Sequence, residues 1–392
     1  MLKKINLSEP YLDIKDQRSV KKSIEEGWVS TAGKSIQDFE RSISKYVKTK
    51  YCVACNSGTS ALHIGLKVLG VKNNDEVIVP SITFIATVNS VKYNGANPIF
   101  MDIDENFNID ENKALQFLKN NTFKKGKYSY NKNTNKIIRV LIVAHIWGGA
   151  SKIKRIISEC KKRNIKVLED AAESLGTFYN FEYLKNKHTG TIADLGVLSF
   201  NGNKIITSGA GGAILINNKN YEKKSRYLIN QAKDNEFFVH NDLGYNYRLP
   251  SLNANLGISQ LKKISYIRER KKKIHFLYRK KFSSSKIFDL YNFPNISDNN
   301  FWMNVIILKK NIDYKFINFL IKDNKKYIEF RRVWLPNERQ KIYMKNERYL
   351  LSKSKDLYDR SICIPSSTNM NIKKINFIFN QINKSYKKFQ KK

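Results

Sequence analysis

Residues 199–212 read Ser199-Phe200-Asn201-Gly202-Asn203-Lys204-Ile205-Ile206-Thr207-Ser208-Gly209-Ala210-Gly211-Gly212. Lys204 follows a strand-like apolar run and precedes a glycine-rich turn, and its neighbours are small or uncharged although the chain contains 71 lysines and arginines. Desolvation among such neighbours favours a neutral amine, which can attack a carbonyl group and form a Schiff base. The stretch therefore predicts a nucleophilic lysine at 204. The alternative, a surface lysine beside a turn, describes nearly every other lysine of the chain.

The length and composition predict a folded protein of two domains. A chain of 392 residues exceeds the size at which one core stops growing, and we place the boundary between a larger α/β domain, 1–250, and a smaller α+β domain, 251–392. Hydrophobic residues make up 41% of the chain, enough for a sizeable core.

The net charge is strongly positive, because 71 basic residues minus 34 acidic residues leave +37. Such a charge is typical of proteins that bind nucleic acids or anionic surfaces. Here lysine recurs along the whole chain instead of forming one basic block, which favours compositional drift over nucleic-acid binding. A third interpretation is that the positive field attracts anionic substrates.

Cysteine usage and hydropathy predict a cytoplasmic protein without metal or membrane partner. Cys52 and Cys55 form a C-x-x-C pair, but no second pair completes a zinc site. Together with Cys160 and Cys363 they fit buried thiols in a reducing compartment. No apolar run approaches the roughly 18 residues of a membrane span, and the N-terminal residues lack the apolar region of a signal peptide.

Strand-like and helix-like segments alternate along the first two thirds of the chain, which predicts a parallel sheet flanked by helices. Ligands in such sheets bind beyond the carboxyl ends of the strands. Residues 120–136 are polar and fit a surface insertion, and a long basic helix is expected from about Ile264. The expected strands are 51–54, 75–80, 98–104, 137–144, 165–168, 197–200 and 213–217. The residues expected beyond their carboxyl ends are Phe84, His145, Asp170 and Lys204.

Two further motifs follow expected strands. Ser57-Gly58-Thr59-Ser60 opens a helix, where free N–H groups, hydroxyls and the helix dipole converge on a possible phosphate site. The same residues also make good N-caps. Asp170 ends a strand, where its carboxylate can pair with a cationic ring nitrogen of pyridoxal phosphate or simply cap a helix.

These motifs, taken together, resemble the DegT-type nucleotide-sugar aminotransferases, which are pyridoxal-phosphate enzymes of fold type I, the aspartate-aminotransferase fold. The resemblance implies a large domain with a mainly parallel seven-stranded sheet between helices, a smaller C-terminal α+β domain and pyridoxal 5′-phosphate as cofactor. The motifs that carry it are 28–34, 56–62, 169–176, 199–212 and 244–256, with a weaker match at 364–367.

The resemblance also implies roles for individual residues. Lys204 matches the lysine that binds the cofactor covalently and shuttles a proton, and Asp170 matches the partner of the pyridine nitrogen. Phe84 matches the aromatic residue stacked on the ring, and Glu173 the position near the phenolic oxygen. The implied phosphate contacts are Gly58, Thr59, Ser199 and, from the neighbouring subunit, Asn246. His145 matches a position near the active site, where a structural role is an equal alternative.

Within the family, the chain is most similar to the subgroup of bacillosamine and legionaminic acid pathways in bacterial surface-glycan biosynthesis. This implies amination of a UDP- or GDP-linked 4-keto-6-deoxy-N-acetylhexosamine with L-glutamate as donor, in a homodimer with shared active sites. One alternative is amination at C3 of the sugar. The other is a protein of this fold that has no enzymatic activity and binds anionic polymers or nucleic acids. Lys204 argues against a dehydratase branch that carries histidine there.

The chain departs from the family motifs at two positions that affect detail. Ala210 interrupts the glycine turn, and Trp147 replaces a smaller aromatic residue.

Overall fold

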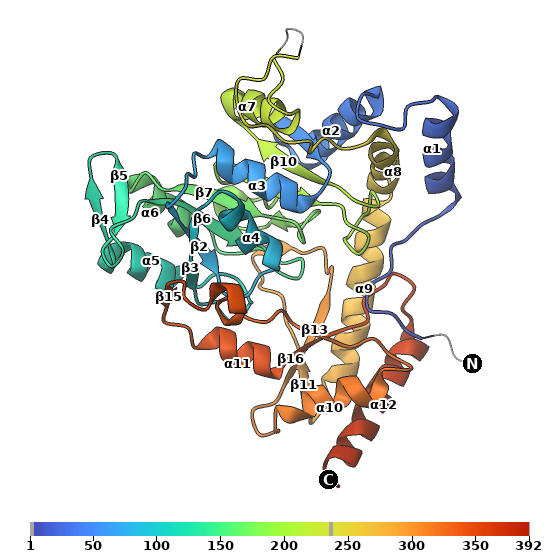
Figure 1. Ribbon diagram of the computed structural model, residues 1–392. Coiled ribbons are helices and arrows are strands. Elements are labelled where there is room, and N and C mark those ends of the chain that lie inside the picture. The colour runs from blue at the N-terminus through green and yellow to red at the C-terminus, as the bar shows by residue number, and fades with distance from the viewer. Residues whose placement is uncertain (1–3, 235–237, 392) are drawn as a thin grey trace.

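The computed structural model describes residues 4–234 and 238–391, and it is organised around an eight-stranded sheet (Figure 1). Across the sheet the order is β1-β10-β9-β7-β6-β2-β3-β15. β10 is antiparallel to both of its neighbours, and the other neighbouring pairs are parallel. The strands are β1 (Tyr51–Cys55), β2 (Glu76–Pro80), β3 (Asn97–Met101), β6 (Ile138–Ala144), β7 (Lys166–Asp170), β9 (Leu195–Ser199), β10 (Gly212–Ile216) and β15 (Arg348–Tyr349).

The prediction of a mainly parallel sheet is confirmed, but the prediction of seven strands is wrong by one. The eighth strand, β15, comes from the C-terminal part of the chain and pairs in parallel with β3 through Arg348 and Tyr349. A two-residue strand has no measurable alternation of polar and apolar residues, so only its position beside the exposed edge of β3 makes it a strand.

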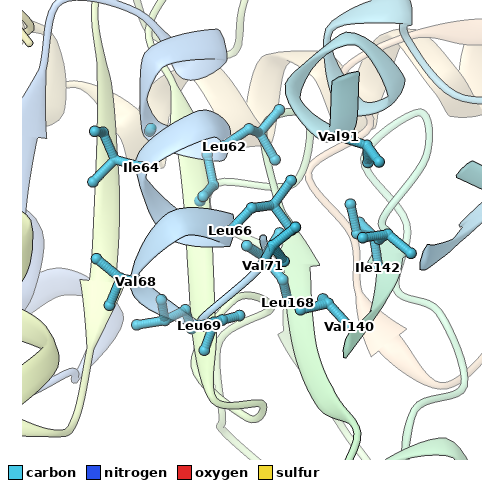
Figure 2. Close-up of a cluster of buried hydrophobic side chains, with 14 of the residues drawn as sticks. Leu62, Ile64, Leu66, Val68, Leu69, Val71, Val91, Val140, Ile142 and Leu168 are labelled. Atoms are coloured by element: carbon cyan, nitrogen blue, oxygen red, sulfur yellow. The ribbon is translucent and has the colours of Figure 1, made fainter. Parts of the chain in front are cut away.

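Helices cover both faces of the sheet, because successive side chains of a strand point to opposite faces. Val140 and Ile142 of β6 pack under one helical layer, shown in Figure 2, whereas Leu141 and Val143 pack under the other. The first layer is formed by α3 (Gly58–Val68), α4 (Ile85–Tyr93) and α7 (Lys219–Ile229). The second is formed by α5 (Glu111–Asn120), α6 (Lys154–Lys162), α2 (Lys34–Val47) and α8 (Ser251–Leu261).

The C-terminal part of the chain builds a second, antiparallel sheet with the order β11-β13-β16-β14. The long basic helix expected from Ile264 is α9 (Ile264–Phe282), which descends from the region of α8 to this sheet in Figure 1. α8 itself packs on α1 and α2, and the domain division after residue 250 stays a prediction. The other elements of this part are β11 (Phe288–Leu290), β13 (Asn304–Leu308), α10 (Lys315–Asn324), β14 (Arg331–Arg332), α11 (Lys353–Arg360), β16 (Ser361–Ile364) and α12 (Ile372–Phe389).

The polar insertion at 120–136 folds as a hairpin of β4 and β5. Asn131 at its base is buried and donates to Glu76 Oε2 at 2.9 Å. The remaining elements are α1 (Ile14–Glu25), β4 (Thr122–Lys125), β5 (Tyr128–Asn131), β8 (Phe178–Tyr179), η1 (Glu182–Leu184), β12 (Ser297–Asp298), η2 (Asn337–Arg339) and η3 (Lys341–Tyr343).

All four cysteines are buried and unpaired, which confirms the expectation of buried thiols. Burial raises the pKa of each of these thiols. Within the described ranges, no helix combines the length and the apolar character needed to span a bilayer.

Asp102 ties the C-terminal segment to the large sheet. Its buried carboxylate accepts hydrogen bonds from the Lys113 ammonium and from the backbone N–H groups of residues 352–354. Each of the three backbone bonds is 2.9 Å long. Burial by itself raises the pKa of Asp102, but these donors outweigh burial and lower the pKa from 3.8 to about 2. The lowered pKa means that the folded state stabilises the ionised form.

Replacing Asp102 with Asn should therefore destabilise the fold by about 2 kcal/mol at neutral pH. Because the folded-state pKa is depressed, this contribution is present above about pH 4 and is lost as the pH falls to about 2. Denaturant unfolding at several pH values measures the difference. The exposed carboxylate of Asp289, 3.6 Å from Lys309, is the matched control, and Asp289→Asn should change stability by less than about 0.5 kcal/mol. Equal losses for both variants would contradict the assignment.

Candidate active site

A cavity of about 260 Å³ opens at the carboxyl edge of the large sheet. Its walls come from the segments that follow β1, β2, β6, β7 and β9, as a parallel sheet requires. Seven of the eight residues predicted for the site line it: Gly58, Thr59, Phe84, Asp170, Glu173, Ser199 and Lys204. His145 also lines it.

The start of α3 forms a tight wall against the end of β9. Ser57 caps the helix by accepting the Ser60 N–H at 3.0 Å, while by helix geometry the N–H groups of Gly58 and Thr59 have no acceptor within the helix. A Cβ on Gly58 would lie only 2.9 Å from Ser199 Cβ. Glycine at 58 thus lets the free N–H groups and the Ser199 hydroxyl converge on one point. This is the donor set that binds phosphate at helix N-termini.

The glycine turn after Lys204 approaches the same wall from the other side. A Cβ on Gly212 would lie 2.4 Å from the Ser57 carbonyl oxygen and 2.5 Å from Gly58 N, so the turn packs against the backbone that precedes α3. Ala210, the departure from the family motif, lines the cavity with an exposed side chain. Alanine is compatible with this position because nothing packs tightly around it.

Asp170 is buried at the end of β7 and is held in two directions. Its Oδ2 accepts the Thr87 hydroxyl at 2.6 Å, and its Oδ1 accepts the Ala172 N–H at 3.1 Å. The helix-cap interpretation of Asp170 is wrong, because residues 171–177 form turns and no helix begins there. Asp170 is instead a buried residue that lines the cavity. Thr87 was not predicted from the sequence. It lies on the first turn of α4, three residues after Phe84, and this helical spacing could have suggested it.

Lys204 extends into the cavity between a carboxyl group and an indole ring. Its Nζ lies 3.6 Å from Glu173 Oε1 and 4.5 Å from the centroid of the Trp302 ring. The side chain is 11% exposed. The amine is therefore largely withdrawn from solvent, in agreement with the small or uncharged neighbours of Lys204 in the sequence.

Glu173 is buried, and this burial raises the pKa of its carboxyl group from 4.5 to about 7, although the Lys204 ammonium and the Trp147 N–H oppose the rise. Oε2 accepts that N–H at 2.9 Å. A carboxyl group with a pKa near 7 can hold or release a proton at neutral pH. Glu173 is thus suited to move a proton beside the Lys204 amine.

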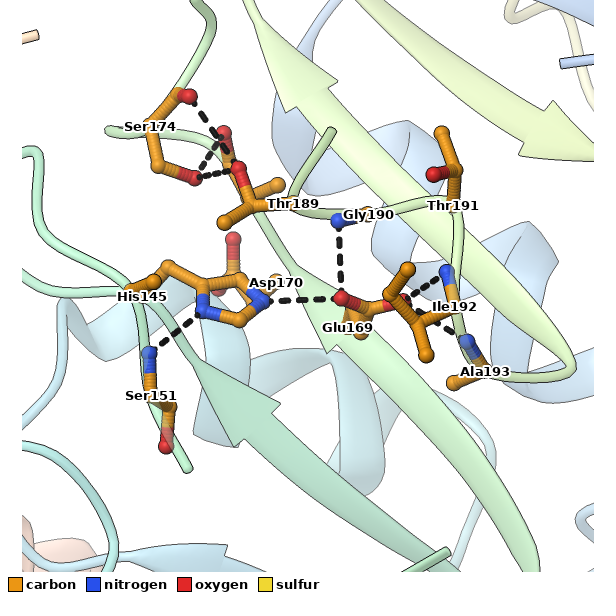
Figure 3. A network of polar contacts seen from close by, with 12 residues as sticks. His145, Ser151, Glu169, Asp170, Ser174, Thr189, Gly190, Thr191, Ile192 and Ala193 are labelled. Atoms are coloured by element: carbon orange, nitrogen blue, oxygen red, sulfur yellow. Dashed lines mark hydrogen bonds and ion pairs between the residues drawn. The ribbon is translucent and has the colours of Figure 1, made fainter. Parts of the chain in front are cut away.

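Figure 3 shows that His145 is locked into a buried network. Its Nε2 donates to Glu169 Oε2 at 3.0 Å, and its Nδ1 accepts the Ser151 N–H at 3.1 Å. Glu169 also accepts backbone N–H groups of residues 190, 192 and 193. Since both ring nitrogens bond to protein groups, the structural alternative for His145 is favoured over a role in proton transfer.

Aromatic rings form another part of the cavity wall. Phe84, half exposed, meets Trp334 edge-on with centroids 6.0 Å apart. Trp147, the second departure from the family motif, is buried behind this wall and stacks on Trp334 at 4.5 Å. The larger ring therefore supports the wall instead of lining the cavity.

Three lining residues from the C-terminal part were missed by the sequence analysis: Trp302, Arg331 and Trp334. Each lies in a segment with no strong motif, so no local pattern could have identified it. Arg331 is the sole arginine among the described lining residues, and its Nε has no hydrogen-bond partner in the part of the chain that the structure describes.

Asn246 is the predicted residue that this chain does not bring into its own cavity. It is exposed, and its carbonyl accepts the Asn56 Nδ2 at 3.3 Å, just before the Ser57–Ser60 cradle. Its predicted role across a subunit interface stays a prediction.

The cavity residues fit pyridoxal 5′-phosphate: free N–H groups and a hydroxyl for the phosphate, a buried carboxylate for the pyridine nitrogen and a withdrawn lysine. Fold and site define the class as pyridoxal-phosphate-dependent aminotransferases of the aspartate-aminotransferase-like fold. A family model described as the DegT/DnrJ/EryC1/StrS aminotransferase family matches residues 10–383, and the chain belongs to this family. It is an aminotransferase of nucleotide sugars in glycan biosynthesis, with pyridoxal phosphate as cofactor.

Individual relatives agree with this assignment. The chain is 31% identical over 382 residues to the putative pyridoxal phosphate-dependent aminotransferase EpsN of Bacillus subtilis, covering 94% of this chain and 92% of that protein. It is 30% identical over 388 residues to GDP-perosamine synthase of Escherichia coli O157:H7, covering 98% and 99%. The fold matches Helicobacter pylori PseC, an aminotransferase involved in pseudoaminic acid biosynthesis, with a TM-score of 0.83 and 23% identity, covering 98% and 100%.

The close approach of Gly58 to Ser199 yields a testable prediction. Gly58→Ala should push α3 away from β9 and weaken cofactor binding by about tenfold or more, equivalent to about 1.4 kcal/mol. Titration of the apo protein with pyridoxal phosphate measures the affinity. Gly202→Ala is the control, because a Cβ there meets nothing within 4 Å. Unchanged affinity in Gly58→Ala would show that the phosphate binds elsewhere.

Proposed function

We propose that this enzyme transfers the amino group of L-glutamate to the C4 carbonyl of a UDP- or GDP-linked 4-keto-6-deoxy-N-acetylhexosamine, as in bacillosamine- or legionaminic-type pathways. The observation that carries the proposal is the position of Lys204 Nζ, 3.6 Å from a carboxyl group whose pKa is about 7 and within the same cavity as Asp170. A lysine amine beside a proton-exchanging carboxyl group suits transfer of a proton to and from carbon. The resemblance of the motifs to the bacillosamine and legionaminic acid subgroup supports the choice of substrate.

When bound, pyridoxal phosphate supplies an electron sink that stabilises negative charge on the donor carbon. The chain's own residues hold and orient it. Asp170, fixed by the Thr87 hydroxyl, would pair with a cationic ring nitrogen, and Ser199 with the start of α3 would bind the phosphate. Lys204 would hold the cofactor through its amine, and the same amine, beside the Glu173 carboxyl group, would carry a proton to and from the reacting carbon.

Arg331 supports glutamate as the donor. It is a cation with an unpartnered Nε in the cavity wall, and arginine bonds carboxylates through paired, charge-assisted hydrogen bonds. We assign the donor's carboxylate to Arg331. The net charge of +37 also favours the approach of both proposed substrates, which are anionic.

Asn246 supports a homodimer with shared active sites. Its exposed side chain lies outside the cavity of its own chain, although its backbone is bonded to the residue before the phosphate cradle. In the proposed homodimer, a second copy would receive this side chain at its phosphate site, as the family resemblance implies. A cytoplasmic location of the enzyme stays a prediction.

Incubation of the enzyme with glutamate and a series of UDP- and GDP-linked 4-keto sugars tests the proposed substrate. We expect a 4-amino product with one preferred nucleotide, identified by mass spectrometry and NMR, and no product with Lys204→Ala. NMR of the product also separates amination at C4 from amination at C3. Failure to aminate any 4-keto sugar would refute the proposed substrate class.

Arg331→Gln should raise the KM for glutamate by about 10- to 100-fold, because a hydrogen bond to a charged group is worth about 1.5–3 kcal/mol. The KM for the keto sugar should change little. The neighbouring Arg332→Gln is the matched control, since Arg332 bonds Asn318 and the Tyr358 carbonyl and does not line the cavity. Steady-state kinetics with each substrate varied in turn give the two constants, and a change confined to the sugar KM would contradict the assignment.

A further inference from the structure

Trp302 is held beside Lys204 by bonds from three directions. Its Nε1–H donates to the carbonyl of Asn203, the residue before Lys204, at 2.7 Å. Its backbone N–H donates to Asn300 Oδ1 at 2.8 Å, and its carbonyl accepts a hydrogen bond from the buried Lys271 Nζ at 3.0 Å. With a side chain only 1% exposed, the ring has no freedom to turn away from Lys204.

The supporting bonds connect Trp302 to the loop that carries Glu173. Asn300 Nδ2 donates to the carbonyls of Glu173 and Leu175, both at 2.9 Å. A Cβ on Gly148 would lie 2.8 Å from Trp302 N, so the chain segments are in close contact here. The indole ring and the Glu173 carboxyl group are therefore parts of one fixed frame around the Lys204 amine.

The distances within this frame suit a cation. Lys204 Nζ lies 4.5 Å from the centroid of the Trp302 ring and 3.6 Å from Glu173 Oε1. A cation within about 6 Å of an indole face is attracted by the negative charge of the ring face, and the attraction increases when solvent is excluded. Bonding of the lysine nitrogen to another group spreads or removes its charge, so the same atoms attract the bound form less strongly.

We propose that Trp302 is a positioning residue that binds the free ammonium of Lys204, together with Glu173, whenever the lysine is not bonded to the cofactor. This inference rests on the proposed role of Lys204. The indole ring keeps the released amine within reach of the reacting carbon and limits its motion. In energetic terms, Trp302 stabilises the form of the enzyme with free lysine relative to the form with bound lysine.

The equilibrium of the half-reaction with glutamate measures the relative stability of the enzyme forms with free and with bound Lys204. The half-reaction consumes glutamate and one water molecule, leaves the amino group on the cofactor, releases 2-oxoglutarate and frees the Lys204 amine. Mono-, di- and trifluorotryptophan at position 302 preserve the shape of the ring and the bond to Asn203 but progressively weaken its attraction for cations. The equilibrium constant of the half-reaction, read from the visible absorbance at fixed ratios of glutamate to 2-oxoglutarate, should fall stepwise. The whole series should span about 2- to 30-fold.

The same fluorinated series at Trp28 is the control, because Trp28 is exposed and does not line the cavity. It should leave the equilibrium constant unchanged. An equilibrium constant that is independent of fluorination at Trp302 would overturn the proposal, because a purely structural role depends on shape and not on ring charge.

A second measurement uses the apo protein and is independent of catalysis. Trp302→Leu, Lys204→Met and the double variant form a cycle whose unfolding midpoints report whether the two side chains interact. We expect Trp302→Leu to lower the midpoint less when Lys204 is already Met, because the interaction is then absent. Additive midpoint shifts would overturn the proposal. If glutamate does not react at all, the proposed function fails, but the apo cycle still decides whether Trp302 binds the amine.

Discussion

The pairing of β7 with β9 sets the geometry of the whole site. The two strands are parallel neighbours, with Asp170 opposite Val197, so the last residue of β7 lies two residues along the ladder from Ser199. Parallel neighbours about 4.8 Å apart cannot place these ends anywhere else. The carboxylate of Asp170, the hydroxyl of Ser199 and the loop to Lys204 therefore meet at one edge of the sheet.

The buried carboxylates near this edge differ in the number of donors they receive. Glu169 faces away from the cavity and accepts three backbone N–H groups and His145 (Figure 3), which compensates the loss of water around an ionised group. Glu173 faces the cavity with one backbone donor and Lys204. Incomplete compensation is what raises the pKa of Glu173 to about 7, so this carboxyl group can exchange protons at neutral pH.

The C-terminal part of the chain completes the cavity wall with its own side chains. α9 carries the chain to the second sheet, and the segments before β13 and around β14 return Trp302 and Arg331 to the cavity. Asp102 and β15 attach the same part to the far side of the large sheet. The cavity is consequently enclosed by two regions that are held together by buried polar bonds, so its shape depends on both.

The sequence alone predicted the mainly parallel sheet, because alternating strands and helices leave local patterns. The resemblance of its motifs to a known family predicted the cofactor and seven of the residues that line the cavity. The tertiary structure decided the rest. It added β15 to the sheet, assigned His145 to a network with both nitrogens bonded, and brought Thr87, Trp302, Arg331 and Trp334 to the cavity wall. Trp302, Arg331 and Trp334 are not marked by a local pattern, since their roles arise from contacts between segments far apart in the chain, and such contacts exist only once the core has packed.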